Sequence, residues 1–375
     1  MSEAQTYRKR RRRLKEQLDS GVVLFLGNSE TPMNYPANPY PFRQDSTFLY
    51  FWGLDIANAA ALIDLDENLE LVFLPDPGPD AIIWSGPDPS RDCLAASSGA
   101  RSGGSLEQLH ALLDRALRQN RRVHFLPQYR PENIQRIASL LDISWTEITA
   151  QASLDLIRAV VSLRSIKDTH EVQEIEKALD ITRAMHTRAM ELSRPGLHER
   201  DLVGAMYAIA SSMGSPHMAF PPILTTQGHI LHNPHHGNEL HQGDLVINDS
   251  GAEAPSHYAA DITRTFPVSG RFSQQQRDIY AIVLRAVEKG IEAVRPGLAY
   301  RDIHFDVARE LVEGLRSLGL MKGETESAVS AGAHALFFPC GLGHMLGLDA
   351  HDMEDLGEVH VGYTPDIQRS PQFGA

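Results

Sequence analysis

Short apolar runs alternate with amphipathic segments over residues 1–150. Contiguous apolar residues predict strands, and apolar residues three to four apart predict helices. The expected strands are 22–26, 59–65, 69–74, 81–84 and 123–126, and the expected helices lie near 106–118 and 131–141. An aromatic-rich segment at 40–53 is interpreted as core packing rather than as a ligand site. This alternation indicates an α/β domain.

A second unit begins near Ser165. The spacing of Ser165 and Asp168 is that of a capping box, and apolar residues follow at helical intervals from Val172 to Leu192. This helix is expected to stop at an Arg-Pro-Gly turn, and another is expected over 199–213. The stretch therefore predicts a pair of helices joined by a short turn.

The turn between these helices is repeated later in the chain. The sequence Arg194-Pro-Gly-Leu-His-Glu-Arg-Asp-Leu recurs as Arg295-Pro-Gly-Leu-Ala-Tyr-Arg-Asp-Ile, 101 residues on, again between two helical patterns. A duplicated helix, turn and helix followed by strands indicates two related halves. A strand pair is therefore expected after His344, but residues 352–375 show little alternation. The second half is expected to be incomplete, with an exposed sheet edge.

Residues 243–267 predict a β-hairpin whose strands carry two aspartates, Asp249 and Asp261, among residues expected to be buried. An isolated buried carboxylate is costly, and residues on neighbouring antiparallel strands can face one another. The two carboxylates are therefore candidates for a divalent-cation site. The alternative is that one aspartate caps the turn at Ser250-Gly251 while the other pairs with Arg264.

Histidines supply two further candidate groups. His344 and His351 lie seven residues apart in a glycine-rich apolar segment, where at least one is a candidate ligand or catalytic group. The alternative for each is a core histidine that is only hydrogen-bonded. Upstream, His232 lies within a short apolar stretch and is the histidine of its loop expected nearest to a site. Cysteine catalysis by Cys340 ranks lower, since no orienting third group is recognised.

Composition and charge narrow the functional class. The chain of 375 residues has a formal net charge of −13, although residues 8–15 hold seven Lys and Arg side chains. We interpret this basic run as the solvated face of a helix, and the acidic remainder argues against nucleic acid as a partner. The apolar run at 22–26 is too short for a signal peptide or a membrane span. Cys93 and Cys340 fit reduced thiols, so a cytoplasmic protein without membrane contact is expected.

Three motifs carry a family resemblance. They are Asp-Ser-Gly-Ala-Glu with the stretch from Tyr258 to Pro267, Gly-Leu-Gly-His344-Met-Leu-Gly-Leu-Asp-Ala-His351-Asp, and Phe42-Arg-Gln-Asp-Ser-Thr-Phe-Leu-Tyr. Together they resemble the Xaa-Pro aminopeptidases (aminopeptidase P) of the pita-bread metallopeptidase family, with prolidase as a close relative, over essentially the whole chain. The resemblance implies an α/β aminopeptidase P-like domain at 1–150, a linker at 151–164 and an α+β pita-bread (creatinase/aminopeptidase-like) catalytic domain at 165–375, C-terminally incomplete.

The resemblance also implies roles for individual residues. Asp249 matches a carboxylate ligand of one metal ion, Asp261 the carboxylate that bridges two ions, and His344 an imidazole ligand of the second. His232 matches a histidine of the substrate pocket, and His351 one that contacts substrate and assists proton movement. The implied reaction releases an amino-terminal residue that precedes proline, using a hydroxide shared by two divalent ions, most often Mn²⁺. A homodimer or higher homo-oligomer is also implied.

Three departures from the family pattern leave alternatives open. The family's remaining two ligands are glutamates beyond the second histidine motif, and Glu354 and Glu358 lack their Glu-Pro-Gly context. Cys340 stands where many relatives have a histidine, and Asp249 and Asp261 are 12 residues apart, one more than in some relatives. The alternatives are an Xaa-Pro dipeptidase (prolidase) and a catalytically impaired or non-catalytic binding or dimerisation protein on the same fold.

Overall fold

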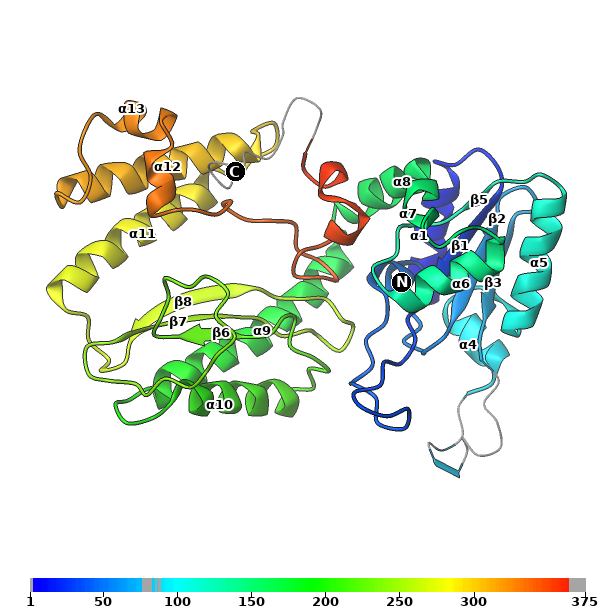
Figure 1. Ribbon diagram of the computed structural model, residues 1–375, viewed down its shortest axis with the longest axis horizontal. Coiled ribbons are helices and arrows are strands. Elements are labelled where there is room, and N and C mark those ends of the chain that lie inside the picture. The colour runs from blue at the N-terminus through cyan, green and yellow to red at the C-terminus, as the bar shows by residue number, and fades with distance from the viewer. Residues whose placement is uncertain (1–2, 76–82, 85, 87–88, 364–375) are drawn as a thin grey trace. The chain divides into compact units, whose positions relative to one another are not determined.

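The computed structural model describes residues 3–75, 83–84, 86 and 89–363 (Figure 1). It contains two compact units, one built on residues up to Lys167 together with Met353–Gly362, and the other on Asp168–Asp352. Among the described residues, no helix is both long enough and apolar enough to cross a membrane.

The first unit is a five-stranded mixed sheet with helices. Its strands are β1 (Val22–Leu26), β2 (Ala60–Asp64), β3 (Leu69–Phe73), β4 (Arg101–Gly104) and β5 (Val123–His124), in the order β4-β3-β2-β1-β5. The central pairs β1/β2 and β2/β3 are antiparallel, and the outer pairs β1/β5 and β3/β4 are parallel. The helices are α1 (Glu3–Lys15), α2 (Ser46–Trp52), α4 (Arg91–Ser97), α5 (Leu106–Arg118), α6 (Pro131–Leu141), α7 (Ile148–Gln151), α8 (Leu154–Arg164) and the short turns η2 (Glu354–Leu356) and η3 (Glu358–His360).

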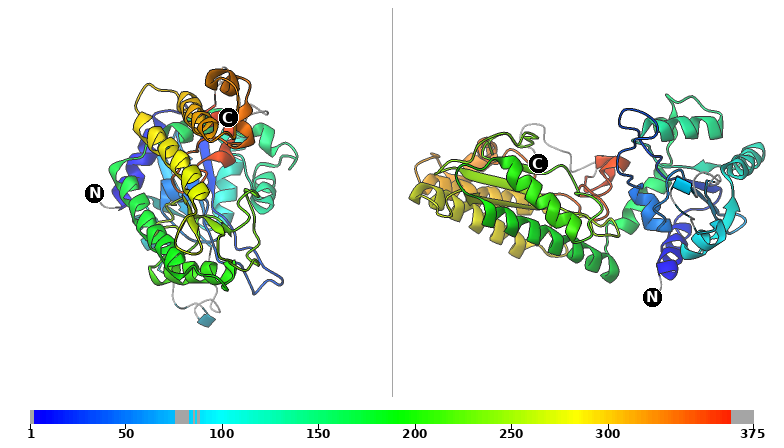
Figure 2. Two further views of the ribbon diagram at one scale, coloured as in Figure 1. Left: turned by 90° about the vertical axis from the view of Figure 1, so that its left-hand side faces the viewer. Right: turned by 90° about the horizontal axis from the view of Figure 1, so that it is seen from below.

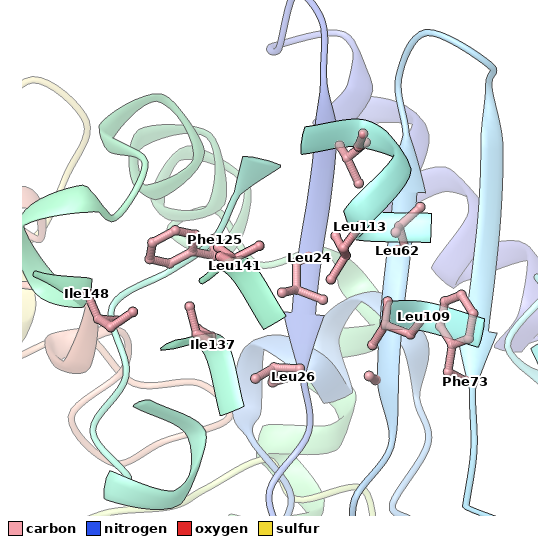
Figure 3. Packing of buried hydrophobic residues seen from close by; sticks show 13 residues of the cluster. Leu24, Leu26, Leu62, Phe73, Leu109, Leu113, Phe125, Ile137, Leu141 and Ile148 are labelled. Carbon is pink, nitrogen blue, oxygen red and sulfur yellow. The ribbon is translucent and has the colours of Figure 1, made fainter. Parts of the chain in front are cut away.

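The core of this unit lies between the sheet and the helices α5 and α6. Figure 3 shows Leu24 and Leu62 of the strands packed near Leu113 of α5, with Ile137 of α6 in the same cluster. The predicted helices and the strands β1, β2 and β3 are therefore present, and the aromatic segment buries all of α2 in the core as expected. The strand expected at 123–126 shortens to two residues, β4 was not predicted, and the strand expected at 81–84 falls mostly outside the described residues.

The basic run of α1 is only partly solvated, so its interpretation as a solvated face is wrong for two residues. Arg10 and Arg11 are 6% and 0% exposed. Arg11 donates from Nε to Glu70 Oε2 at 2.8 Å and from Nη1 to the carbonyl of Phe51 at 2.7 Å, and its guanidinium lies 4.4 Å from the ring centroid of Trp52. These partners compensate the burial of a cation, which helical periodicity alone cannot reveal.

The second unit pairs four long helices with a small sheet. Its helices are α9 (Thr169–Leu192), α10 (Glu199–Ser212), α11 (Gln274–Ala293), α12 (Tyr300–Ser317) and α13 (Thr325–Ser330), with the turn η1 (Ala333–Leu336). Its strands β6 (Ile223–Thr225), β7 (Leu245–Ser250) and β8 (Ile262–Pro267) form an antiparallel sheet in that order. Seen from below in Figure 2, α9 and α10 lie across one face of this sheet. The hairpin predicted at 243–267 is thus formed by β7 and β8, and β6 was not predicted.

The start of α9 differs in one detail from the prediction. Asp168 is the N-cap, its side chain accepts from the backbone N–H of His170 at 2.9 Å and of Glu171 at 3.0 Å, and Glu171 completes the capping box. Ser165 instead ends α8. The predicted capping box was therefore placed three residues too early, because Ser-x-x-Asp and Asp-x-x-Glu overlap there.

The repeated turn has the same backbone conformation in both copies. Gly196 between α9 and α10 has a φ of 88°, and Gly297 between α11 and α12 has a φ of 86°. Glycine populates positive φ without the steric cost of a Cβ, so the Arg-Pro-Gly sequence specifies this turn twice. The predicted duplication of helix, turn and helix is present. Between His344 and residue 363, the described chain forms short helical turns and no strand.

Candidate metal centre

Asp249 lies near the end of β7, a strand with two unlike faces. Val246, Asn248 and Ser250 are buried, whereas the residues between them are partly exposed. Val246 packs in the cluster formed with α9 and α10. Successive strand residues point to opposite faces, so the side chain of Asp249 lies on the face turned away from these helices. Its cross-strand neighbour is Thr263 of β8.

Asp261 reaches the same face from the other strand. It precedes β8 by one residue and Thr263 by two, so it shares the face of Thr263 and of Asp249. Gly251 permits the close backbone approach beside these residues, because a Cβ at this position would lie only 1.6 Å from the carbonyl oxygen of Ala260. The hairpin thus brings two carboxylates together at one end of the sheet.

The surroundings of Asp249 disfavour its negative charge. Burial raises the pKa of Asp249 above its ordinary value; a hydrogen bond with Thr263 opposes this rise, while Asp261 adds to it through its charge and through a side-chain hydrogen bond. The nearby His232 also opposes the rise. Within the described part of the chain, the buried Oδ1 of Asp249 has no hydrogen-bond partner. A bound cation would offset both the repulsion between the carboxylates and the missing hydrogen bond.

His344 completes the group from a distant part of the sequence. Its Nε2 lies 3.2 Å from Oδ2 of Asp261, and its Nδ1 lies 2.9 Å from the carbonyl oxygen of Met345. A carbonyl oxygen only accepts, so Nδ1 carries a hydrogen and the neutral ring presents the lone pair of Nε2 to the carboxylate. Two acceptors face each other at this distance only with a positive charge between them or a second proton on the ring. The arrangement therefore suits a metal ion.

The remaining two candidate residues lie beside this group. The ring of His351 stacks on the ring of His344, with centroids 3.8 Å apart and planes inclined by 15°. His232 is exposed and interacts electrostatically with Asp249. The structure therefore gathers all five side chains singled out from the sequence into one neighbourhood of the second unit.

The connection between the two aspartates is anchored on α9. The backbone N–H of Ala252 donates to Oγ1 of Thr182 at 3.0 Å, and the hydroxyl of Tyr258 donates to Oε1 of Glu171 at 2.9 Å. Another link joins the two ligand segments directly, since the N–H of Ala259 donates to the carbonyl of Gly347 at 2.7 Å. These bonds limit how far Asp261 and the His344 segment can move relative to one another.

A buried polar network supports β7 from behind. His186 of α9 accepts at Nδ1 from the side-chain amide of Asn248 at 3.2 Å and donates from Nε2 to the carbonyl of Ser250 at 3.2 Å. Asn248 and Ser250 flank Asp249, and both are 0% exposed. Sequence reasoning missed His186 as well as Glu171 and Thr182. A sequence signal for these three residues does exist, because they are polar residues on the side of an amphipathic helix that is otherwise apolar.

The competing interpretations find less support in the geometry. Arg264 is exposed and donates from Nη1 to the carbonyl of its neighbour Thr263 at 2.7 Å. Cys340 is an exposed free thiol. Glu354 and Glu358 lie in the short turns η2 and η3, within the segment that groups with the first unit. The aspartates and His344 remain the candidate ligands.

These three side chains fit divalent metal ions. Carboxylate oxygens suit hard ions such as Mn²⁺ and Mg²⁺, and an imidazole nitrogen extends the range to Zn²⁺. Among the described residues, the buried Oδ1 of Asp249 has no hydrogen-bond partner, and Nε2 of His344 lies 3.2 Å from the Asp261 carboxylate, so both atoms are placed to serve as ligands. Three protein ligands also leave coordination positions for water or substrate.

Comparison with known proteins is consistent with this chemistry. Residues 173–369 match the metallopeptidase family M24, and residues 7–124 match the amino-terminal domain of aminopeptidase P. The Xaa-Pro aminopeptidase of Escherichia coli is 32% identical over 364 residues, which make up 94% of this chain and 82% of that protein. The Xaa-Pro aminopeptidase of Haemophilus influenzae is 30% identical over 356 residues, 94% of this chain and 81% of that protein.

Solved structures give the same result. The aminopeptidase PepP of Pseudomonas aeruginosa aligns with a TM-score of 0.84 at 26% identity, covering 93% of this chain and 81% of that one. Zinc-substituted Escherichia coli aminopeptidase P in complex with product aligns with a TM-score of 0.82 at 30% identity, covering 99% of this chain and 90% of that one. The expected architecture, an α/β amino-terminal domain and a pita-bread catalytic domain, is confirmed, and the chain belongs to the metallopeptidase family M24.

Proposed function

We propose that the chain is a divalent-metal-dependent aminopeptidase that releases an amino-terminal residue preceding proline. The observation that carries the proposal is the convergence of Asp249, Asp261 and His344, with His344 Nε2 only 3.2 Å from the Asp261 carboxylate. Several relatives named Xaa-Pro aminopeptidase support the choice of substrate. The proposed occupant is a pair of divalent ions, with Mn²⁺ expected first and Zn²⁺ as the alternative that the zinc-substituted relative suggests.

The ligands have separate tasks in this proposal. Asp261, which lies next to both other ligands, would be shared between two ions, while Asp249 and His344 would each hold one. When bound, such ions polarise a carbonyl group and make water a nucleophile near neutral pH. The hydrogen bond from Nδ1 of His344 to Met345 fixes the ring so that Nε2 stays directed at the site.

Two histidines are proposed to act on the peptide. His351, exposed and stacked on His344, can hold a proton for the amine that leaves when the peptide bond breaks. His232 is exposed beside Asp249, whereas His351 lies beside His344. His232 is therefore positioned to contact the substrate at the Asp249 end of the centre. An imidazole ring has one nitrogen that can donate a hydrogen and one that can accept it, which suits substrate binding and proton movement.

Hydrolysis by the metal-reconstituted chain tests the proposal. Purified protein is treated with chelator, supplied with Mn²⁺ or Zn²⁺, and given Xaa-Pro-Yaa and Xaa-Ala-Yaa peptides of the same length and, separately, the dipeptide Xaa-Pro. Release of Xaa from the proline peptide alone is expected. Release only from the dipeptide Xaa-Pro would favour a prolidase, and a folded chain that binds no metal and cleaves nothing would favour a non-catalytic role.

Asp261→Asn gives the sharpest variant. It should lower kcat/KM by about 10²-fold or more, because metal ions supply several kcal/mol of transition-state stabilisation. Asp244→Asn on the same hairpin is the matched control, since Asp244 accepts from the backbone N–H of His241 and lies outside the proposed centre. Equal losses in the two variants would show that the effect is structural.

Light scattering on the same samples tests the expected homodimer or higher homo-oligomer.

A further inference from the structure

A second cluster of metal-ligating side chains lies in the connection between β7 and β8. Glu253 and His257 come from this connection, and His217 comes from the segment before β6. Each of the three residues offers one potential ligand atom, and these three atoms all lie within 4.8 Å of one another. Nδ1 of His257 is 2.7 Å from Oε2 of Glu253, and the rings of His217 and His257 are 5.9 Å apart. None of these side chains belongs to the centre formed by Asp249, Asp261 and His344.

The backbone holds this cluster in place. The N–H of Glu253 donates to the carbonyl of His217 at 3.0 Å, and Met218 and Ala252 form a β-bridge beside it. His257 has a φ of 69°, and its N–H donates to the carbonyl of Ala254 at 2.8 Å. A non-glycine residue at positive φ is strained, and such strain gathers at sites where a side chain must be held in one direction.

Two of the three potential ligands are buried, unlike most acidic and histidine side chains at a protein surface. Glu253 is 5% exposed and His257 is 4% exposed. A buried carboxylate needs a compensating positive charge, and a cation bound at this cluster would supply one. His217 is less buried, so an ion can reach the cluster from its side.

The chemistry of the donors selects the class of ion. Two imidazoles and one carboxylate carry a net charge of −1 when the imidazoles are neutral, and this set is typical of three-ligand zinc sites with an open fourth position. Ligand atoms about 2.1 Å from a tetrahedral ion lie about 3.4 Å apart. The His257–Glu253 hydrogen bond would therefore have to open by less than about 1 Å. The other donor pairs lie within 4.8 Å and would have to close by up to about 1.4 Å.

We propose that His217, Glu253 and His257 bind a divalent transition-metal ion, with Zn²⁺ as the best match. The ion replaces the proton shared by His257 and Glu253, and it ties the segment before β6 to the connection that carries Asp261 at its end. Its effect is to stabilise that connection. The site does not depend on peptidase activity, so its test and the hydrolysis test fail separately.

The experiment separates this site from the main centre. Asp249→Asn and Asp261→Asn are combined to remove the two carboxylates, and the chelator-treated protein is titrated with Zn²⁺ by calorimetry. One equivalent of Zn²⁺ is expected to bind, and Co²⁺ in its place is expected to show the visible absorption of a low-coordinate site. Adding His217→Gln should weaken Zn²⁺ binding at least about tenfold, and Glu253→Gln should do the same.

A control and a second measurement keep the proposal falsifiable. His110→Gln removes one exposed histidine from the first unit and should leave the affinity unchanged. If the double aspartate variant does not fold, the same comparison is made in the otherwise unaltered chain, where His217→Gln should reduce bound Zn²⁺ by one equivalent. Folding is checked by circular dichroism. A folded double variant that binds no Zn²⁺, or one whose binding survives both His217→Gln and Glu253→Gln, overturns the proposal.

Discussion

The two helix pairs of the second unit share a turn motif but differ in what covers them. In the first pair, Met185 of α9 and Met206 of α10 are 0% exposed and pack with Leu224 and Val246 of the sheet. In the second pair, α11 packs on α12 through one face, while Ile279, Val283, Val287 and Ile291 are 37% to 69% exposed on another. The Arg-Pro-Gly repeat therefore specifies a helix pair, and the burial of its second face depends on other segments.

The same difference shapes the candidate metal centre. The first half supplies Asp249 and Asp261 from paired strands that α9 supports through hydrogen bonds. The second half supplies His344 from a segment without helix or strand. Ligands on strands keep their geometry more closely than ligands on irregular backbone. The first half thus fixes the position of the centre, and the link from Ala259 to Gly347 aligns the second half with it.

The largest expected contrast concerns core packing in the two pairs. Met185→Ala should lower the free energy of unfolding by about 2–5 kcal/mol, because it removes a fully buried side chain. Val287→Ala on α11 should change it by less than about 0.5 kcal/mol, since Val287 is 50% exposed. Urea denaturation of both variants measures the difference. A similar loss of unfolding free energy in both variants would mean that the exposed face of α11 is covered in solution. The difference between the two helix pairs would then not hold.

A smaller contrast separates two buried histidines. His186→Leu should cost about 1–3 kcal/mol, because Asn248 and the carbonyl of Ser250 lose their buried partner. His304 of α12 is 2% exposed, and both its ring nitrogens are without a hydrogen bond in the part of the chain that the structure describes. His304→Leu should therefore be close to neutral or stabilising. Thermal melts of the two variants at one pH decide this, and the reverse order would refute the assignment of partners.

The smallest expected effect is a change of stability with pH. Burial lowers the pKa of His304, with a further contribution from His334, and burial also lowers the pKa of His334 and of His186. A histidine with a lowered pKa binds protons more weakly when folded than when unfolded. Its contribution to stability is complete above the unfolded pKa of about 6.5 and is lost as pH falls toward the folded value.

The free energy of unfolding should therefore decrease on acidification from about pH 7 to about pH 5. Because His304→Leu removes one of these groups, that variant should lose less stability over the same interval. Urea titrations at a series of pH values measure both slopes. Equal slopes in the variant and the parent chain would remove His304 from the set of responsible groups.

Much of this architecture could be predicted from local sequence patterns. The Asp249 and Asp261 hairpin follows from alternation around a turn, and the two helix pairs follow from apolar spacing and the Arg-Pro-Gly repeat. Such patterns report on neighbours along the chain, so they reveal strands and helices better than contacts between them.

Long-range contacts account for what was missed. Arg11 was placed in solvent because Glu70 and the carbonyl of Phe51 approach it only in the folded sheet. His217 joins Glu253 through a bridge between segments that carry no shared motif. The three-residue strand β6 lacks enough residues for a periodic signal.

Titration with Mn²⁺ tests the central assignment most directly. Electron paramagnetic resonance measures free Mn²⁺ against protein concentration for the unaltered chain, Asp261→Asn and Asp244→Asn after removal of bound metal. Tight binding is expected for the unaltered chain and for Asp244→Asn, and its loss is expected in Asp261→Asn, because Asp261 lies beside both Asp249 and His344. Unchanged Mn²⁺ binding by a folded Asp261→Asn protein would contradict the assignment.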